Sequence, residues 1–285
     1  MPLSIQQSPS LCCTLCVVRF GEKKRRTVGK KTHSQRQQTF FFWSSQMSAG
    51  RKLIVFGGNG FVGSRVTKAA IESGWKVVVA CRSGAPTVAS SEPWAYHAQY
   101  VAIDALSRAQ VNELLDDHPD TAVVVSCIGA VTTNNVDGRR FNGDATINMA
   151  AALYERKSIK KLVFVSAADL QPFNFVLKGC YQGKRAAERA MLENIESRST
   201  ILRPAFIYGN RMITPPGVMV PLGLIGAPLR AVFQPLHRLI PLSILTPPIS
   251  VDEVANAAVY ACQESSVTGV HEYQGITHLA SALAQ

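Results

Sequence analysis

The sequence predicts an α/β fold built on a doubly wound parallel sheet, with a small apolar region near the C-terminus. Short apolar runs alternate with segments of helical spacing between residues 52 and 202, and this alternation is typical of βαβ units. A glycine-rich turn at 57–63 joins the first apolar run to the first helical segment. The run at 122–126 lacks the polar alternation of a half-exposed strand, as expected of a strand buried on both faces.

The individual elements follow from the apolar spacing along the chain. Strands are expected over 53–56, 76–80, 100–103, 122–126, 162–166 and 200–202. Helices are expected over 61–73, 109–116, 144–155, 183–196 and 251–262. The last helix follows Ser250-x-x-Glu253, a capping-box pattern.

The charge is distributed unevenly along the 285 residues. The net charge is +11, and residues 1–52 contribute ten Lys and Arg against one acid, so the remainder is nearly balanced at +2. A protein that binds nucleic acid carries its basic residues on the folded surface. The sequence therefore argues against nucleic acid as a partner.

The seven cysteines and six histidines predict neither disulfides nor a metal site. Four cysteines are scattered through the domain, and the tail motif of Cys12, Cys13 and Cys16 has no fourth ligand at a suitable spacing. Free thiols in a reducing compartment are the simplest interpretation.

Residues 1–50 have the composition of an N-terminal extension outside the fold. They are basic, rich in Ser, Gln and Thr, and nearly free of acids, as organellar transit peptides are. A mitochondrial transit peptide is the leading interpretation, and a plastid one is open. Three alternatives remain. They are a disordered basic tail, a secretory signal around residues 11–18, and translation from Met47, which would leave the protein in the cytoplasm. The secretory signal is disfavoured because the basic residues follow the apolar run instead of preceding it.

The glycine-rich turn is the strongest candidate site. Its residues follow a predicted strand and open a predicted helix, where a dinucleotide pyrophosphate meets backbone N–H groups and the positive end of a helix. Glycines let the backbone approach the phosphates closely. The predicted binding residues are Gly57, Gly58, Asn59, Gly60, Phe61, Val62 and Gly63.

The end of the second strand favours NADP(H), with NAD(H) as the alternative. NAD-binding domains usually carry an acid there, which accepts a hydrogen bond from the ribose 2′-hydroxyl. This sequence has Arg82 and Ser83 instead. Arginine suits a 2′-phosphate because its guanidinium is planar and always charged.

The chain resembles the extended and atypical short-chain dehydrogenases/reductases over about residues 52–277. The resemblance rests on the glycine-rich turn, Asp104, the turn 126–129, Asn148, Ser166 and the stretches 202–209 and 251–255. It is closest to mitochondrial members that assist coenzyme Q biosynthesis, on the stretch 180–188 and the Pro-rich segment. The NADPH-binding accessory subunit of respiratory complex I is more distant. The resemblance implies a Rossmann fold and further cofactor contacts at Asp104, Cys127, Ile128, Gly129, Lys184 and Pro204.

The catalytic motif of that family, Tyr-x-x-x-Lys, is disrupted here. Lys184 is present, but Cys180 stands four residues before it and Tyr181 stands three before it. Residues three apart share a helix face, so Tyr181 either replaces the usual proton donor or packs structurally. Ser166 falls at the family's catalytic Ser/Thr position, and a structural role at the strand end is equally open. The candidate catalytic residues are Ser166, Tyr181 and Lys184.

Residues 210–249 form an apolar, Pro-rich segment without acids. Prolines are expected to prevent a long regular helix there. The segment is expected to form a surface for a membrane or prenylated quinone, or a lid packed on the sheet. Arg211, Arg230, His237 and Arg238 are candidates for contact with anionic headgroups.

These observations favour an NADP(H)-binding reductase or dehydrogenase with an apolar substrate. The resemblance implies mitochondrial ubiquinone biosynthesis or support of a respiratory complex. A non-catalytic nucleotide-binding scaffold and a nucleotide-sugar epimerase are the alternatives.

Overall fold

The computed structural model describes residues 50–86, 92–170, 173–213, 218–239 and 246–285. The expected extension over residues 1–50 lies, except for Gly50, outside these ranges. None of the helices within them is both long and apolar enough to cross a membrane. Nor do the described residues include a cluster of side chains able to hold a metal ion.

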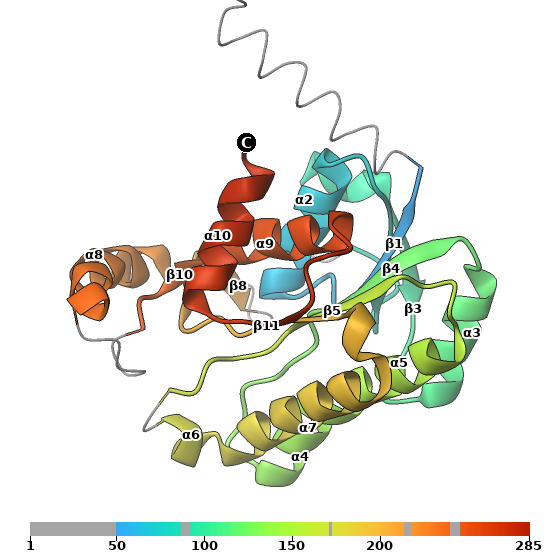
Figure 1. The fold of residues 1–285 in the computed structure, drawn as a ribbon, viewed down its shortest axis with the longest axis horizontal. Helices are drawn as coiled ribbons and strands as arrows, with labels where there is room; N and C mark the ends of the chain where they lie inside the picture. The colour runs from blue at the N-terminus through green and yellow to red at the C-terminus, as the bar shows by residue number, and fades with distance from the viewer. Residues whose placement is uncertain (1–49, 87–91, 171–172, 214–217, 240–245) are drawn as a thin grey trace, which may run out of the picture.

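A seven-stranded parallel sheet forms the centre of the fold, in the order β11-β6-β5-β4-β1-β2-β3 (Figure 1). This confirms the doubly wound α/β fold predicted from the sequence. Six strands correspond to predicted ones, and β11 was missed. The strands are β1 (Lys52–Phe56), β2 (Lys76–Cys81), β3 (Ala98–Ala102), β4 (Thr121–Ser126), β5 (Lys161–Val165), β6 (Ser199–Leu202) and β11 (Gly269–His271).

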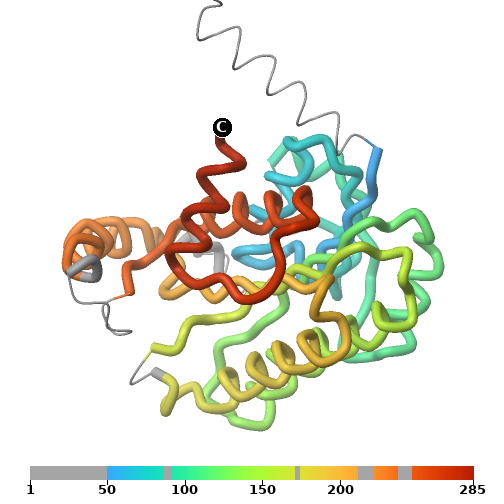
Figure 2. Tube along the Cα trace, in the orientation of Figure 1, coloured from blue at the N-terminus to red at the C-terminus, as the bar shows by residue number. Residues whose placement is uncertain are grey.

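Helices cover both faces of the sheet, and each face has its own apolar core. One layer contains α2 (Phe61–Glu72), α9 (Val251–Gln263) and α10 (Tyr273–Leu283), which pack side by side although they come from opposite ends of the chain (Figure 2). The other contains α3 (Arg108–Asp117), α5 (Ala145–Glu155) and α7 (Lys178–Ile195). The capping box before α9 is confirmed, because Ser250 and Glu253 exchange both hydrogen bonds.

The chain reverses its winding direction between β1 and β4. The strand after β1 pairs on one side of it, and β4 pairs on the other. In such sheets a crevice opens at the carboxyl ends of the strands at this switch point, and ligands bind there.

On the second face, one helix begins earlier than predicted and another is preceded by helical turns that were not predicted. Helix α7 starts at Lys178 and not at Gly183, and α5 follows α4 (Asn135–Arg139) and a π-helical turn, η3 (Arg140–Asp144). The glycines of α7 lie inside the helix. Here they allow close helix packing: a Cβ on Gly179 would lie 2.2 Å from the carbonyl oxygen of Asn135, and one on Gly183 would lie 2.5 Å from that of Arg139.

The prediction that prolines prevent a long helix over 210–249 is wrong. Helix α8 (Gly223–Leu239) includes Pro228 and Pro235. Two pairs of short strands adjoin α8: β7 (Ile207–Tyr208) pairs with β10 (Ile249–Ser250), and β8 (Asn210–Ile213) pairs with β9 (Val218–Pro221). Elsewhere in the fold, the short helix α6 (Phe173–Val176) precedes α7. Each proline removes one backbone hydrogen bond from α8.

Candidate nucleotide-binding site

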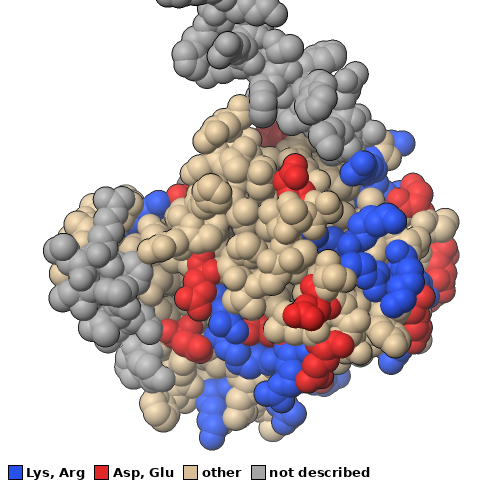
Figure 3. All heavy atoms as spheres, viewed as in Figure 1, with Lys and Arg blue, Asp and Glu red and all other residues tan. Residues whose placement is uncertain are grey.

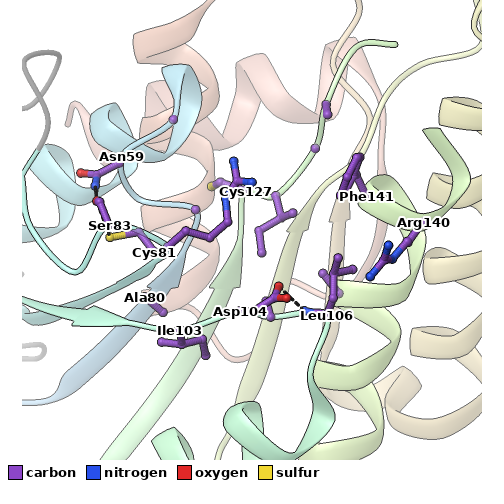
Figure 4. A pocket seen from close by; sticks show the side chains of 18 residues that line it. Asn59, Ala80, Cys81, Ser83, Ile103, Asp104, Leu106, Cys127, Arg140 and Phe141 are labelled. Atoms are coloured by element: carbon purple, nitrogen blue, oxygen red, sulfur yellow. Dashed lines mark hydrogen bonds between the residues drawn. The ribbon is translucent and has the colours of Figure 1, made fainter. Parts of the chain in front are cut away.

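A pocket of about 640 Å³ opens at the carboxyl ends of β1, β2, β3 and β4 (Figure 4). Its position is the switch point of the sheet, where a ligand is expected. It brings together nine of the predicted cofactor residues: Gly57, Asn59, Gly60, Arg82, Ser83, Asp104, Cys127, Ile128 and Gly129. It is also lined by Ala80, Cys81, Ile103, Ala105, Leu106, Ala130, Arg140, Phe141 and Ala145.

The glycine-rich turn is closed so tightly at Gly57 and Gly63 that side chains would not fit at these two positions. Gly57 has a φ of 77°, and a Cβ on Gly63 would lie 2.1 Å from the carbonyl oxygen of Gly57. The turn leads directly into α2, with Gly60 as its N-cap residue. The positive end of the helix dipole therefore faces the pocket, an arrangement suited to a pyrophosphate.

Asn59 ties the glycine-rich turn to the loop after β2. Its amide nitrogen donates to the Ser83 hydroxyl at 3.0 Å and to the Ala85 carbonyl oxygen at 2.8 Å, and it lies 3.2 Å from the Cys81 sulfur. Figure 4 shows Asn59 and Ser83 facing each other across this junction. These bonds fix the backbone on both sides of Arg82, an exposed residue that lines the pocket.

The loop after β3 forms the floor of the pocket. A carboxylate oxygen of Asp104 accepts from the Leu106 backbone N–H at 3.0 Å. Asn148, on α5, supports the loop by donating to the carbonyl oxygens of Ala105 and Leu106. The structure therefore gives Asn148 a supporting position behind the floor.

The wall opposite Asn59 was missed by the sequence analysis. Arg140 and Phe141 enter the pocket from the π-helical turn (Figure 4). Their neighbour Asn142 is buried and donates to the carbonyl oxygens of Ala130 and Gly138, both at 2.8 Å. No local sequence pattern signals this π-helical turn, although such turns often occur at functional sites.

Lys184 lies behind the pocket wall formed by Gly129. A Cβ on Gly129 would be 3.4 Å from the Lys184 ammonium nitrogen, which donates to the Val165 carbonyl oxygen at 3.0 Å. Burial disfavours the ammonium and lowers the pKa of Lys184 to about 8. Lys184 is thus beside the pocket but is not one of its lining residues.

Cys180 occupies the position where the family motif has its tyrosine. Its thiol is buried and lies 3.3 Å from the carbonyl oxygens of both Ala130 and Thr132. The Tyr181 hydroxyl makes no hydrogen bond to Lys184 within the described part of the chain. Burial, with the nearby Asp169 carboxylate, raises the pKa of Tyr181, which is the opposite of what a proton-donating pair with lysine requires.

Ser166 is held in a buried charge network away from the pocket lining. Its hydroxyl donates to Glu188 at 2.5 Å, and Glu188 also pairs with Arg185 at 2.5 Å and with Arg203 at 2.6 Å. The side chain of Glu188 is 3% exposed. This geometry favours the structural interpretation of Ser166.

The remaining predicted residues support the site from behind. The pocket lining does not include Gly58, Phe61, Val62, Gly63 or Pro204. Gly58 packs so closely that a Cβ would lie 2.7 Å from a Val79 methyl group. The buried Pro204 accepts from the Ala168 backbone N–H at 2.8 Å.

The lowered pKa of Lys184 predicts a pH-dependent stability. Below pH 8 the lysine is charged in both folded and unfolded states, so its burial penalty is fully present. Between about 8 and its usual value of 10.5 the unfolded state binds more protons, so the free energy of unfolding should rise with pH. Urea unfolding across this range should show the rise in the native protein and its loss in Lys184→Met. Identical pH profiles for the two proteins would contradict the buried ammonium.

Comparison with known proteins identifies relatives over most of the chain. Residues 57–221 match a family described as NAD(P)H-binding. An uncharacterized chloroplastic protein of Arabidopsis thaliana is 31% identical over 278 residues, covering 93% of this chain and 90% of the relative. MIOREX complex component 2 of Saccharomyces cerevisiae is 38% identical over 86 residues, covering 29% of this chain and 30% of the relative.

Solved structures with the same fold include nucleotide-sugar enzymes. The UDP-glucose 4-epimerase of Thermotoga maritima, bound to UDP-glucose, is 15% identical with a TM-score of 0.56, covering 81% of each chain. The enzyme WbmF of Bordetella bronchiseptica, in complex with NAD+ and UDP, is 18% identical with a TM-score of 0.57, covering 84% of this chain and 77% of its own. The glycine-rich turn, the pocket at the switch point and the family match agree, and the chain belongs to the NAD(P)H-binding family of Rossmann proteins related to atypical short-chain dehydrogenases/reductases.

Proposed function

We propose that the protein is an NADP(H)-dependent oxidoreductase that acts on an apolar acceptor of the quinone class. The proposed preference for NADP(H) rests on the two residues that follow β2. Arg82 lies there in the pocket wall with Ser83, in place of an acid. A guanidinium and a hydroxyl are suitable partners for a 2′-phosphate, whereas an acid would repel it.

The disrupted catalytic motif favours a quinone over an ordinary ketone. Reduction of a ketone forms a strongly basic alkoxide, which must receive a proton from a nearby donor. The family's usual donor is a tyrosine, and Cys180 stands in its place here. Hydride transfer from NADPH to a quinone instead forms a phenolate-type oxygen, whose pKa is near 10. That oxygen takes its proton from water, so NADPH, one proton and the quinone give NADP+ and the quinol.

We further propose that the protein works in an organelle, in quinone biosynthesis or in support of a respiratory complex. Two observations support an organelle: the basic, acid-poor residues 1–50, and the chloroplastic Arabidopsis relative. The composition of the extension fits either a mitochondrial or a plastid transit peptide.

The second candidate is a nucleotide-binding scaffold without catalysis. The observation that favours it is that Lys184 donates to the Val165 carbonyl oxygen and, among the described residues, not to the Tyr181 hydroxyl, whose pKa is raised by burial. The missing Tyr/Lys pair also argues against epimerase activity, which relies on that pair. The epimerase structures share the fold, and their low identity supports no more than that.

Replacing Arg82 by alanine should weaken NADPH far more than NADH. A hydrogen bond to a charged phosphate contributes about 1.5–3 kcal/mol, so NADPH affinity should fall roughly 10- to 150-fold. The measurement is a titration of the full-length protein with both nucleotides. Arg189→Ala, an exposed arginine on α7, is the control and should leave both affinities unchanged. Equal losses for NADPH and NADH in Arg82→Ala would remove the proposed preference.

The catalytic part of the proposal is tested by NADPH oxidation with a soluble short-chain quinone. The native protein should turn over, and Arg82→Ala should need a higher NADPH concentration for the same rate. Tight NADPH binding without any quinone-dependent oxidation would favour the scaffold.

A further inference from the structure

A helix on the surface of a water-soluble protein normally buries its apolar face against the core. Helix α8 does the opposite and turns its apolar face to solvent. Within residues 223–236, the part of α8 whose side chains the structure describes, the solvent-facing side chains are apolar. Leu224 is 76% exposed, Val232 63% and Ile225 61%. The exposed face also includes Ala227, Pro228, Leu229, Ala231, Pro235 and Leu236.

The polar side of α8 faces the protein instead. Arg230 makes two hydrogen bonds to Glu253 at the start of α9, one of them at 2.8 Å, and a third to the Tyr208 hydroxyl at 3.3 Å. Gly226 is buried on the same side, where a Cβ would lie 2.2 Å from the Cβ of Tyr208. The helix is therefore fixed in this orientation by a polar anchor, and its apolar face is left outward.

This anchor changes the role expected for Arg230. The sequence suggested that Arg230 would contact anionic headgroups, but its charge is already paired with Glu253. The anchor holds the helix in place, and the contact with a partner falls to the apolar face.

The segment around α8 is also unusual in charge. No acid occurs between Glu196 and Asp252, whereas five arginines do. Arg203 and Arg230 pair with Glu188 and Glu253, so the basic character of the segment rests on Arg198, Arg211 and Arg238. Charged side chains of both signs cover the lower and right-hand parts of the molecule in Figure 3. An apolar helix face in an acid-free, basic segment is complementary to an anionic lipid surface.

We propose that α8 is an interfacial helix that docks the protein on an anionic membrane, with its apolar face buried among the lipids and its axis along the surface. The helix packs against β7 and β10, and β7 follows the carboxyl end of β6. Docking would therefore bring that end of β6 close to apolar molecules dissolved in the lipid. The proposal does not depend on the redox activity.

A lipid surface explains this face better than a second copy of the chain. In a symmetric dimer the same patch meets itself, so two basic, acid-free segments would face each other without an opposite charge. A membrane with anionic headgroups supplies both the apolar phase and the negative charge.

The test uses flotation of the full-length protein with vesicles of phosphatidylcholine and phosphatidylserine. The native protein should float, and the double variant Leu224→Glu/Val232→Glu should partition at least about tenfold more weakly, because both sites face solvent in the free protein. Val136→Glu, a change on α4 at a residue with the same 76% exposure as Leu224, is the matched control and should float like the native protein. Circular dichroism and NADPH titration would verify that the variants fold.

The basic residues 1–52 are the same in all these proteins, so a difference between variants reports on α8. Hydrogen exchange should in addition slow within residues 223–239 when vesicles are added. Native protein that does not float, or a double variant that floats equally well, would overturn the proposal. Self-association that disappears in the double variant without any vesicle binding would identify a second copy as the occupant. Failure of NADPH binding or quinone reduction would leave the flotation result unaffected.

Discussion

Replacing Gly60 with aspartate is expected to abolish NAD(P)H binding while leaving the fold intact. Gly60 is the N-cap residue of α2, with φ and ψ of −76° and 173°, a conformation open to any residue. Aspartate is a favoured N-cap residue, so the helix should be at least as stable as before. Its carboxylate would nevertheless stand where the pyrophosphate approaches. Two like charges about 4 Å apart repel by about 4 kcal/mol near a protein surface, which corresponds to a loss of more than about 100-fold in affinity.

The control for this charge effect is Gly60→Ala. A Cβ at residue 60 would lie 3.1 Å from the Gly57 carbonyl oxygen, a tight contact that slight movement can relieve, so its affinity should fall much less. Thermal unfolding would show that both variants are folded, and NADPH titration would compare their affinities. Unchanged NADPH binding in a folded Gly60→Asp protein would show that the nucleotide does not bind at this turn.

The largest expected loss of stability comes from Glu188→Ala. Glu188 is buried and balances two arginines, Arg185 and Arg203, while accepting from the Ser166 hydroxyl. Its removal leaves those cations without their main partner, and breaking a buried pair in this way costs about 3 kcal/mol. Urea unfolding of the native and variant proteins measures the difference.

Glu193→Ala provides the comparison, because Glu193 is an exposed acid on the same helix. It should change the free energy of unfolding by less than about 0.5 kcal/mol. If Glu188→Ala changes the free energy of unfolding by a similarly small amount, solvent must hydrate the Arg185 and Arg203 guanidinium groups in place of the ion pairs. Ser166→Ala should cause a modest loss of stability from the broken hydrogen bond to Glu188. If Ser166 also acts in catalysis, the folded variant would in addition lose turnover.

The sheet and half of the site could be predicted because their signals are local. Buried parallel strands are read directly as apolar runs, and the turn at 57–63 needs its glycines within seven residues. Arg82 and Asp104 follow two of those strands, so their positions at one edge of the sheet follow from the topology.

The opposite wall could not be predicted, because it depends on a helix distortion. Arg140 reaches the pocket from a π-helical turn, and the apolar spacing of 144–155 indicates an ordinary helix beginning later. The partners of Glu188 were equally hidden. Arg203 lies fifteen residues away on another element, and no local pattern pairs the two residues.

Helix α8 shows a different limit of sequence reading. The prediction relied on the two prolines and gave less weight to the helical spacing of the apolar residues. A proline inside a helix removes one backbone hydrogen bond, and the ion pair between Arg230 and Glu253 can offset that cost. The spacing also could not indicate which face would turn outward. That depends on Arg230 finding Glu253 at the start of α9.

The position of Cys180 limits what a single mutation can restore. Cysteine and tyrosine codons differ by one base, so one base change would place the family's usual tyrosine at residue 180. In the fold, however, the thiol sits between the carbonyl groups of Ala130 and Thr132, and a Cβ on the facing Gly138 would come within 3.1 Å of it. A phenol ring in the place of the thiol would overlap these groups. Cys180→Tyr would therefore require either that α4 and α7 separate or that the ring points away from the position of the thiol, so one base change does not by itself restore the family motif.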